Sequence, residues 1–153
     1  MKKFVSGNPE ELKKFAQNFA KKILLGKQRK RGAPAPSKAG LILALIGELG
    51  SGKTTFVKNF AQVLGIKEKI KSPTFIIFRK HKIPKLKFLY HFDAYRIKDE
   101  KEILNLGWKE IISDPKNIVL VEWADKIKKI LPKNCVKINF KHKGKGERAI
   151  IIG

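Results

Sequence analysis

Acidic residues are scarce in this sequence, with 13 Asp and Glu against 35 Lys and Arg and a formal net charge of +22 at pH 7. Such an excess of positive charge favours association with polyanions, of which RNA is the obvious candidate. Most of the cations are lysines spread along every segment, as a codon usage biased toward lysine would also produce. The charge therefore leaves RNA binding and simple lysine bias as alternatives.

Cysteine and long apolar runs are nearly absent as well. The single cysteine, Cys135, excludes an internal disulfide and agrees with a reducing compartment. No apolar run approaches the roughly 20 residues of a membrane-spanning helix. The start, MKKFVSGNPEELKKF, is basic but lacks the apolar stretch of a signal peptide. We expect a cytoplasmic protein without membrane association, folded as one domain over residues 1–153.

A glycine-rich motif follows the first strongly apolar run of the chain. Residues 41–46, LILALI, lead directly into GELGSGKT at 47–54, which fits the phosphate-loop pattern G-x-x-x-x-G-K-[ST]. The alternative is an ordinary glycine turn between a strand and a helix, but the apolar run before the motif and the amphipathic pattern after it favour a phosphate loop. The residues predicted to bind a nucleotide here are Gly47, Glu48, Leu49, Gly50, Ser51, Gly52, Lys53 and Thr54.

Each part of this motif has a physical task. Glycines let the backbone curl so that successive N–H groups point at phosphate oxygens, and the N-terminus of the following helix adds partial positive charge. Lys53 is placed to reach the β- and γ-phosphates, and the hydroxyl of Thr54 is placed to ligate Mg²⁺. The motif therefore predicts a nucleotide site that contains magnesium.

Periodic apolar residues predict the elements around the loop. Asn8 and Pro9 begin a helix whose apolar stripe ends near Leu24, and a second helix runs from Lys53 to Gly65. We expect a broken helix over 99–112 and a short one over 124–131. Segment 26–40 is basic and aperiodic, which predicts a mobile surface loop that either contacts RNA or a partner or is a solvated linker. The predicted strands are 41–46, 75–78, 86–92, 118–121, 136–140 and 148–152.

Alternating helices and strands around a buried centre predict an α/β fold. The class we expect is a three-layer sandwich of the P-loop NTPase type, with a mostly parallel central sheet and added antiparallel strands. In such a sheet, ligands bind at the carboxyl ends of the strands.

Two predicted strands end in an acid. Ile118–Val121 is followed by Glu122, the Walker-B arrangement, and the run 88–92 is followed by Asp93. Carboxylates at these ends can hold magnesium or orient a nucleophile during phosphoryl transfer. Each acid could instead pair with one of the many lysines, but the scarcity of acids and the nearby phosphate loop favour function.

The roles of three nearby side chains cannot be decided from the residues alone. Thr74 opens a predicted strand and either approaches a γ-phosphate, as switch threonines do, or belongs to an ordinary turn. Arg96 either contacts phosphate or supports a carboxylate. His91 lies two positions before Asp93, and this pair suits a metal, but no third ligand stands out and a packing histidine is favoured.

Four motifs in order, GELGSGKTTF (47–56), SPTF (72–75), HFDAYR (91–96) and VEWAD (121–125), make this chain resemble the TsaE family, formerly YjeE. These are small bacterial ATPases of tRNA threonylcarbamoyladenosine synthesis, and the resemblance covers essentially the whole chain. It implies a protein that binds and hydrolyses ATP with Mg²⁺ to support the partners TsaD and TsaB, which carry out the transfer. Contact with tRNA would then come through the partner complex.

The resemblance also implies roles for particular residues. Lys53 and Thr54 hold phosphate and magnesium, Thr55 lies at the α-phosphate end of the loop, and Trp123 belongs to the nucleotide site. Asp93, Glu122 and Thr74 are the implied catalytic residues, and Thr54, Glu122 and Asp93 the implied metal-linked ones. Which acid positions the attacking water stays open.

Two other classes of protein are alternatives. A small-molecule kinase shares the strand, loop and helix, but such enzymes usually carry an arginine-rich lid. This chain has only five arginines, none of them clustered in a lid-like segment after the core. A basic RNA-binding protein without turnover is the third class, and its binding would weaken steeply with salt.

Overall fold

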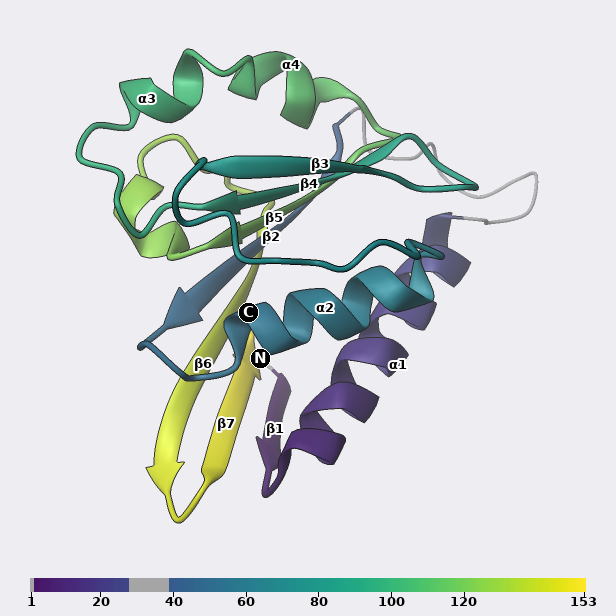
Figure 1. The fold of residues 1–153 in the computed structure, drawn as a ribbon, viewed down its shortest axis with the longest axis vertical. Coiled ribbons are helices and arrows are strands. Elements are labelled where there is room, and N and C mark those ends of the chain that lie inside the picture. Colours follow the sequence, from purple (N-terminus) through teal and green to yellow (C-terminus); the bar gives the residue numbers. More distant parts are fainter. Residues whose placement is uncertain (1, 28–38) are drawn as a thin grey trace.

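The computed structural model describes residues 2–27 and 39–153, whose strands form a single mixed sheet (Figure 1). The sheet lies between two layers of helices, as the sequence predicts for this fold class. No helix in the described ranges is long and apolar enough to cross a membrane. In spatial order the strands are β1 (Lys2–Ser6), β7 (Glu147–Ile152), β6 (Val136–Gly144), β2 (Leu41–Gly47), β5 (Ile118–Glu122), β4 (Phe88–Asp93) and β3 (Phe78–Lys82).

The centre of the sheet is parallel and its edges are antiparallel. Strand β2 pairs in parallel with β5 and with β6, and β5 pairs in parallel with β4. Strands β3, β7 and β1 add antiparallel pairs at the two sides. The register places Asp93 opposite Glu122, so the two strand-end acids are neighbours at the same edge of the sheet. The parallel core thus carries both acids to the end of β2, where the glycine-rich loop begins.

One face of the sheet is covered by α1 (Pro9–Lys27) and α2 (Lys53–Val63) (Figure 1). Helix α1 starts at the predicted cap: the backbone N–H of Glu11 donates to Asn8 Oδ1 at 2.9 Å, and the Gly7 N–H donates to Glu11 Oε2 at 2.7 Å. The predicted apolar stripe of α1 packs on α2, where Phe56 is fully buried beneath Phe19, with ring centroids 6.0 Å apart. These rings fix the direction in which α2 leaves the loop.

The opposite face is covered by α3 (Lys101–Leu104), α4 (Trp108–Ser113) and the 3₁₀ helix η1 (Ala124–Ile127). Trp108, almost fully buried, meets the ring of Phe92 edge-on with centroids 5.3 Å apart. Strand β2 contributes to both cores, since Leu43 faces α1 and α2 while Ala44 faces the other layer. Burial on both faces explains why β2 is a continuous apolar run.

The structure corrects some of the predicted elements. The strand predicted over 75–78 is wrong: Thr74 to Ile76 form a turn, Ile77 lies in a bend, and β3 begins only at Phe78. The helix predicted over 124–131 is regular only to Ile127. Strand β1 was not predicted. Helix α1 extends through Lys27, two residues into the loop predicted over 26–40, and residues 28–38 of that loop lie outside the described residues.

Replacement of Phe56 by Ala tests the packing of α2. Phe56 has no exposed surface, so the substitution leaves a cavity, and we expect the free energy of unfolding to fall by about 3–5 kcal/mol. Phe75→Ala is the matched control, because that side chain is 80% exposed and its loss should cost less than about 1 kcal/mol. Chemical denaturation measures both, and equal losses would contradict the packing described here.

Candidate active site

The glycine-rich loop curls between the end of β2 and the start of α2. Gly50 and Gly52 have positive φ angles of 72° and 103°, which only glycine adopts readily. A Cβ atom on Gly52 would also lie 2.7 Å from Cδ2 of Leu12 in α1. The backbone N–H of Phe56 donates to the Gly52 carbonyl at 2.8 Å, so the helix begins directly at the loop. The loop therefore has the glycine-dependent path that the sequence predicts.

Lys53 is folded back over this loop. Its Nζ donates to the carbonyl oxygens of Gly47 at 2.7 Å and Glu48 at 2.8 Å, and it lies 4.0 Å from the ring centroid of Trp123. Burial lowers the pKa of the Lys53 ammonium below its ordinary value, while the negative charges of Glu122, and then of Asp93, act in the opposite direction. The ammonium is thus held at the loop by weak neutral acceptors, where an anion would be a stronger partner.

Glu122, at the end of β5, joins the loop to the sheet. The Thr54 hydroxyl donates to Glu122 Oε2 at 2.8 Å, and His91 Nε2 lies 2.8 Å from Glu122 Oε1. Because a carboxylate only accepts hydrogen bonds, the ring nitrogen of His91 is the donor. His91 is therefore more than the packing residue favoured from the sequence, since its buried ring orients a strand-end acid.

Asp93, at the end of β4, holds the segment that precedes β3. Its Oδ2 accepts hydrogen bonds from the hydroxyls of Thr74 at 2.7 Å and Ser72 at 3.0 Å, and its Oδ1 accepts the N–H of Tyr95 at 2.9 Å. The Asp93 N–H donates to the carbonyl of Ile77, whose φ angle is 67°. These bonds turn the chain where a strand was predicted, and they bring Thr74 to the acid.

A cavity of about 330 Å³ contains most of the residues predicted for the site. Gly47 and Glu48 are the exceptions: they line a separate hollow with β6, and only their carbonyl groups face Lys53. The predicted residues that line the cavity are Leu49, Gly50, Ser51, Gly52, Lys53, Thr54, Thr55, Thr74, Asp93, Glu122 and Trp123.

Three further residues line the same cavity and were not predicted to do so. Ser72 and Tyr95 belong to the motifs SPTF and HFDAYR, so the motifs were a signal that could have found them. Arg148 of β7 is remote in sequence from these motifs, so no motif pointed to it. Arg96 does not line the cavity, and its guanidinium lies 4.3 Å from the ring centroid of Phe75. In the described residues it forms no ion pair with a carboxylate, so the structure bears out neither of its two interpretations: the guanidinium packs on an aromatic ring.

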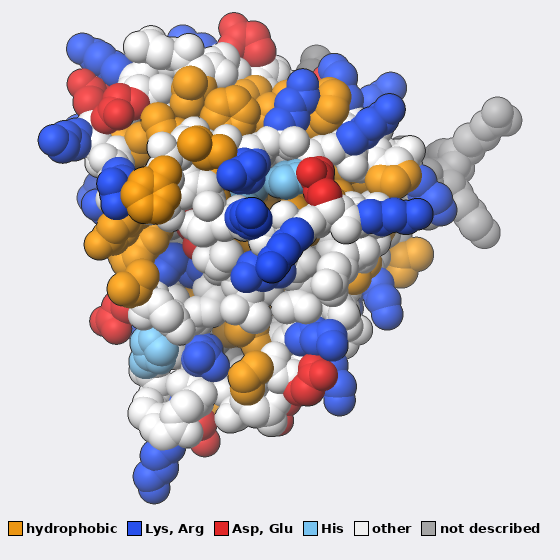
Figure 2. Space-filling model, viewed as in Figure 1, with side chains coloured by type: hydrophobic (Ala, Val, Ile, Leu, Met, Phe, Trp, Pro, Cys, Tyr) orange, Lys and Arg blue, Asp and Glu red, His pale blue; other side chains and the backbone are white. Residues whose placement is uncertain are grey.

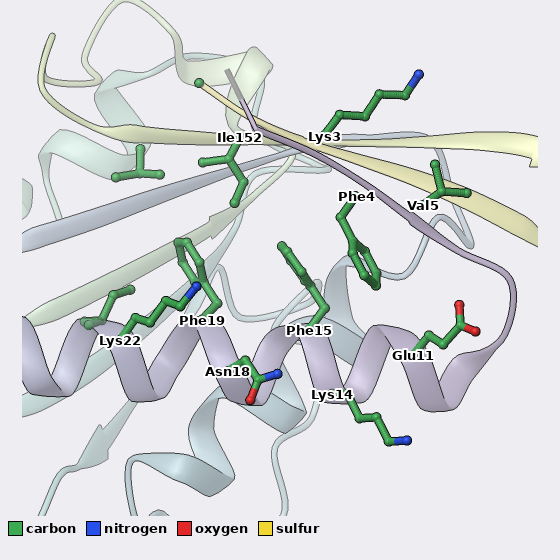
Figure 3. Close-up of a pocket in the computed structure, with 13 residues that line it drawn as sticks. Lys3, Phe4, Val5, Glu11, Lys14, Phe15, Asn18, Phe19, Lys22 and Ile152 are labelled. Carbon is green, nitrogen blue, oxygen red and sulfur yellow. The ribbon is translucent and has the colours of Figure 1, made fainter.

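A larger hollow of about 1120 Å³ lies between β1 and α1 (Figure 3). Phe4, Phe15 and Phe19 point into it, and Lys3, Lys14 and Lys22 lie along its rim. It has no glycine-rich backbone curl and no pair of carboxylates. The chemistry of phosphate binding therefore belongs to the smaller cavity at the end of β2.

The side chains of the smaller cavity suit a magnesium ion. Mg²⁺ prefers oxygen ligands, typically one or two carboxylates together with phosphate oxygens and water. The Thr54 hydroxyl already lies beside the Glu122 carboxylate, and Asp93 is opposite Glu122 in the sheet. Within the described residues, no group of three or more His, Cys, Asp and Glu side chains forms a metal site of its own. A metal here would thus need oxygens from a bound ligand.

Replacement of Asp93 by Ala should release segment 72–77. The change removes the acceptor of two hydroxyls and of the Tyr95 N–H, so we expect chymotrypsin to cut after the exposed Phe75 about ten times faster, since about 1.4 kcal/mol of lost loop stability gives a factor of ten. Asp125→Ala is the control, because Asp125 is an exposed acid that holds no hydroxyl of this segment. Unchanged cleavage rates in Asp93→Ala would contradict the conclusion that Asp93 holds this segment through its hydrogen bonds.

Comparison with known proteins places these motifs in a family. The family model for "Threonylcarbamoyl adenosine biosynthesis protein TsaE" matches residues 6–150. The tRNA threonylcarbamoyladenosine biosynthesis protein TsaE of Bacillus subtilis is 41% identical over 143 residues, which cover 94% of this chain and 79% of that protein. The protein of the same name from Rickettsia prowazekii is 35% identical over 133 residues, covering 86% and 81%.

Solved structures agree with the sequence matches. The crystal structure of Bacillus subtilis YdiB superposes with a TM-score of 0.69 at 34% sequence identity, covering 97% of this chain and 82% of that one. The similarity thus extends over nearly the whole of this chain. The chain belongs to the TsaE family, whose members take part in the biosynthesis of tRNA threonylcarbamoyladenosine.

Proposed function

We propose that this protein binds ATP with Mg²⁺ and hydrolyses it in support of tRNA threonylcarbamoyladenosine synthesis. The observation that carries the proposal is the meeting of a phosphate loop with two strand-end acids and a threonine in one cavity. A glycine turn alone would have no need of buried acids nearby, yet Glu122 and Asp93 are 2% and 3% exposed. Buried carboxylates in a protein so poor in acids indicate chemistry at this place.

Nucleotide binding follows from the loop. The loop and the first turn of α2 line the cavity, so the free backbone N–H groups at the start of the helix would receive the β-phosphate. Lys53 would leave the Gly47 and Glu48 carbonyls for the more negative phosphate oxygens, because a charge-assisted bond to an anion is the stronger one. The loop is thus close to the geometry that nucleotide binding would need.

Hydrolysis would use the acids in two different ways. Glu122 accepts a hydrogen bond from Thr54, and this contact supports the proposal that the two residues would hold Mg²⁺, directly or through its water ligands, with His91 orienting the carboxylate. Asp93 accepts a hydrogen bond from Thr74 and would orient the attacking water beside the γ-phosphate. This division assigns metal binding to one acid and water positioning to the other.

This protein would act in the cytoplasm, through partner proteins. TsaD and TsaB would transfer the threonylcarbamoyl group, and ATP turnover by this chain would reset or support their complex. Lys and Arg side chains are spread over several elements on the face seen in Figure 2. Contact with tRNA is therefore proposed to come through the partner complex, not through this chain alone.

Lys53→Ala should abolish ATP hydrolysis. Loss of a preorganised cation at the phosphates typically costs a factor of about 100 or more, and we expect a decrease of that size in the rate of Mg²⁺-dependent phosphate release. Lys58→Ala is the matched control, because Lys58 lies on the exposed side of the same helix. Undiminished hydrolysis in Lys53→Ala would contradict the assignment of this loop to the active site.

The same assay separates hydrolysis from phosphoryl transfer to another acceptor. With labelled ATP, transfer to water supports the proposal, whereas label on an added nucleoside or sugar would make the protein a small-molecule kinase. Removal of Mg²⁺ with a chelator should stop the reaction in either case.

Reconstitution of tRNA modification tests the role. With TsaD, TsaB, their substrates and tRNA, we expect sustained synthesis of the modified nucleoside only when this chain and ATP are present. Asp93→Asn should lower turnover while ATP binding is kept, and Glu122→Gln should raise the Mg²⁺ concentration needed for half-maximal activity, since the amide is a poorer ligand. Equal synthesis with and without the chain would overturn the role.

A further inference from the structure

Among the residues that the structure describes, Arg148 is the one arginine that lines the cavity, and it comes from the side of the sheet away from the acids. It projects from β7 over the phosphate loop: a Cβ atom on Gly52 would lie 3.6 Å from Arg148 Cδ and 3.7 Å from its Nε. Because Gly52 has no side chain, the arginine stem packs directly on the loop backbone. The guanidinium is thus brought to the rim of the place where phosphate is expected.

This guanidinium has no partner in the part of the chain that the structure describes. Its Nε is buried without a hydrogen-bond acceptor, and no acid of residues 2–27 or 39–153 forms an ion pair with Arg148. Lys53, by contrast, is satisfied by two carbonyls of its own loop. A buried donor without an acceptor is costly, so the position of Arg148 calls for an anion that the chain does not itself supply.

The strand order fixes which end of a nucleotide Arg148 would meet. The loop follows β2; Glu122 and Asp93 lie on its β5 and β4 side, whereas Arg148 lies on its β6 and β7 side. Phosphoryl transfer takes place beside the acids. Arg148 is therefore on the far side of the loop from the bond that would break.

We propose that Arg148 binds the non-transferred phosphates, so that it holds the diphosphate part shared by ATP and ADP. The inference rests on the proposed function, because it needs a nucleotide in the loop. Guanidinium suits this task, since its planar fork makes two hydrogen bonds to phosphate oxygens and keeps its charge at any physiological pH. An arginine in this role would strengthen binding of ATP and ADP alike, and would contribute little to the hydrolytic step.

Calorimetric titration with MgADP and with a non-hydrolysable MgATP analogue tests the proposal. In Arg148→Gln we expect both dissociation constants to rise by a similar factor of about 10 to 100, the usual effect of losing a hydrogen-bonded charge. The KM for ATP should rise with them, and much more than kcat falls. Arg148→Lys, which keeps the charge but not the fork, should lie between the wild type and Arg148→Gln.

Two controls keep this test decisive. Arg79→Gln removes an arginine from β3 that does not line the cavity, and should leave both dissociation constants unchanged. Arg148→Met keeps the stem that packs on Gly52, so it reports on the lost guanidinium if Arg148→Gln proves unstable in thermal unfolding. Weak binding in Arg148→Met with an unchanged melting temperature supports the proposal.

The outcomes distinguish the inference from the function on which it rests. If the wild type binds nucleotide and both Arg148→Gln and Arg148→Met bind it equally well, Arg148 is not a phosphate ligand and the inference is overturned. A fall in kcat with unchanged dissociation constants would also overturn it, by placing Arg148 at the transition state. If the wild type binds neither nucleotide, the proposed function fails first and the inference fails with it.

Discussion

The buried carboxylate of Glu122 is the interaction on which the rest of the site depends. It accepts one hydrogen bond from Thr54 at the first turn of α2 and one from His91 in the neighbouring strand. Burial of a carboxylate is costly unless its oxygens are hydrogen-bonded, and these two bonds offset that cost. Since one comes from the loop helix and the other from the sheet, the carboxylate ties the phosphate loop to the strand ends.

The loop is also supported from its other side. Leu12 of α1 and Arg148 of β7 both pack against Gly52, while the rings of α1 hold α2 through Phe56. Segments from both ends of the described chain therefore meet at one glycine. The parallel centre of the sheet supplies the acids, and the antiparallel edge with its covering helix supplies the outer wall. This division lets the site combine a rigid loop with side chains that come from distant strands.

Local patterns were sufficient to predict much of this arrangement. The phosphate loop could be predicted because its geometry depends on glycines and a helix start within a few residues, and the acids could be predicted because each ends an apolar run. Segment 75–78 was misjudged because its apolar residues favour a strand, whereas hydrogen bonds to Asp93, remote in sequence, turn the chain there. Arg148 reaches the loop only through the pairing of β7 with β1 and β6, a non-local register that no short pattern encodes.

The contact between Lys53 and Trp123 has an optical consequence. The indole lies 4.0 Å from the ammonium, and indole emission responds to nearby charge, so movement of Lys53 toward a ligand changes the surroundings of a chromophore. The other indole, Trp108, is 1% exposed and packs in the opposite core against Phe92, where it provides a steady background. The protein thus carries an indole whose emission would report movement of Lys53 without any added label.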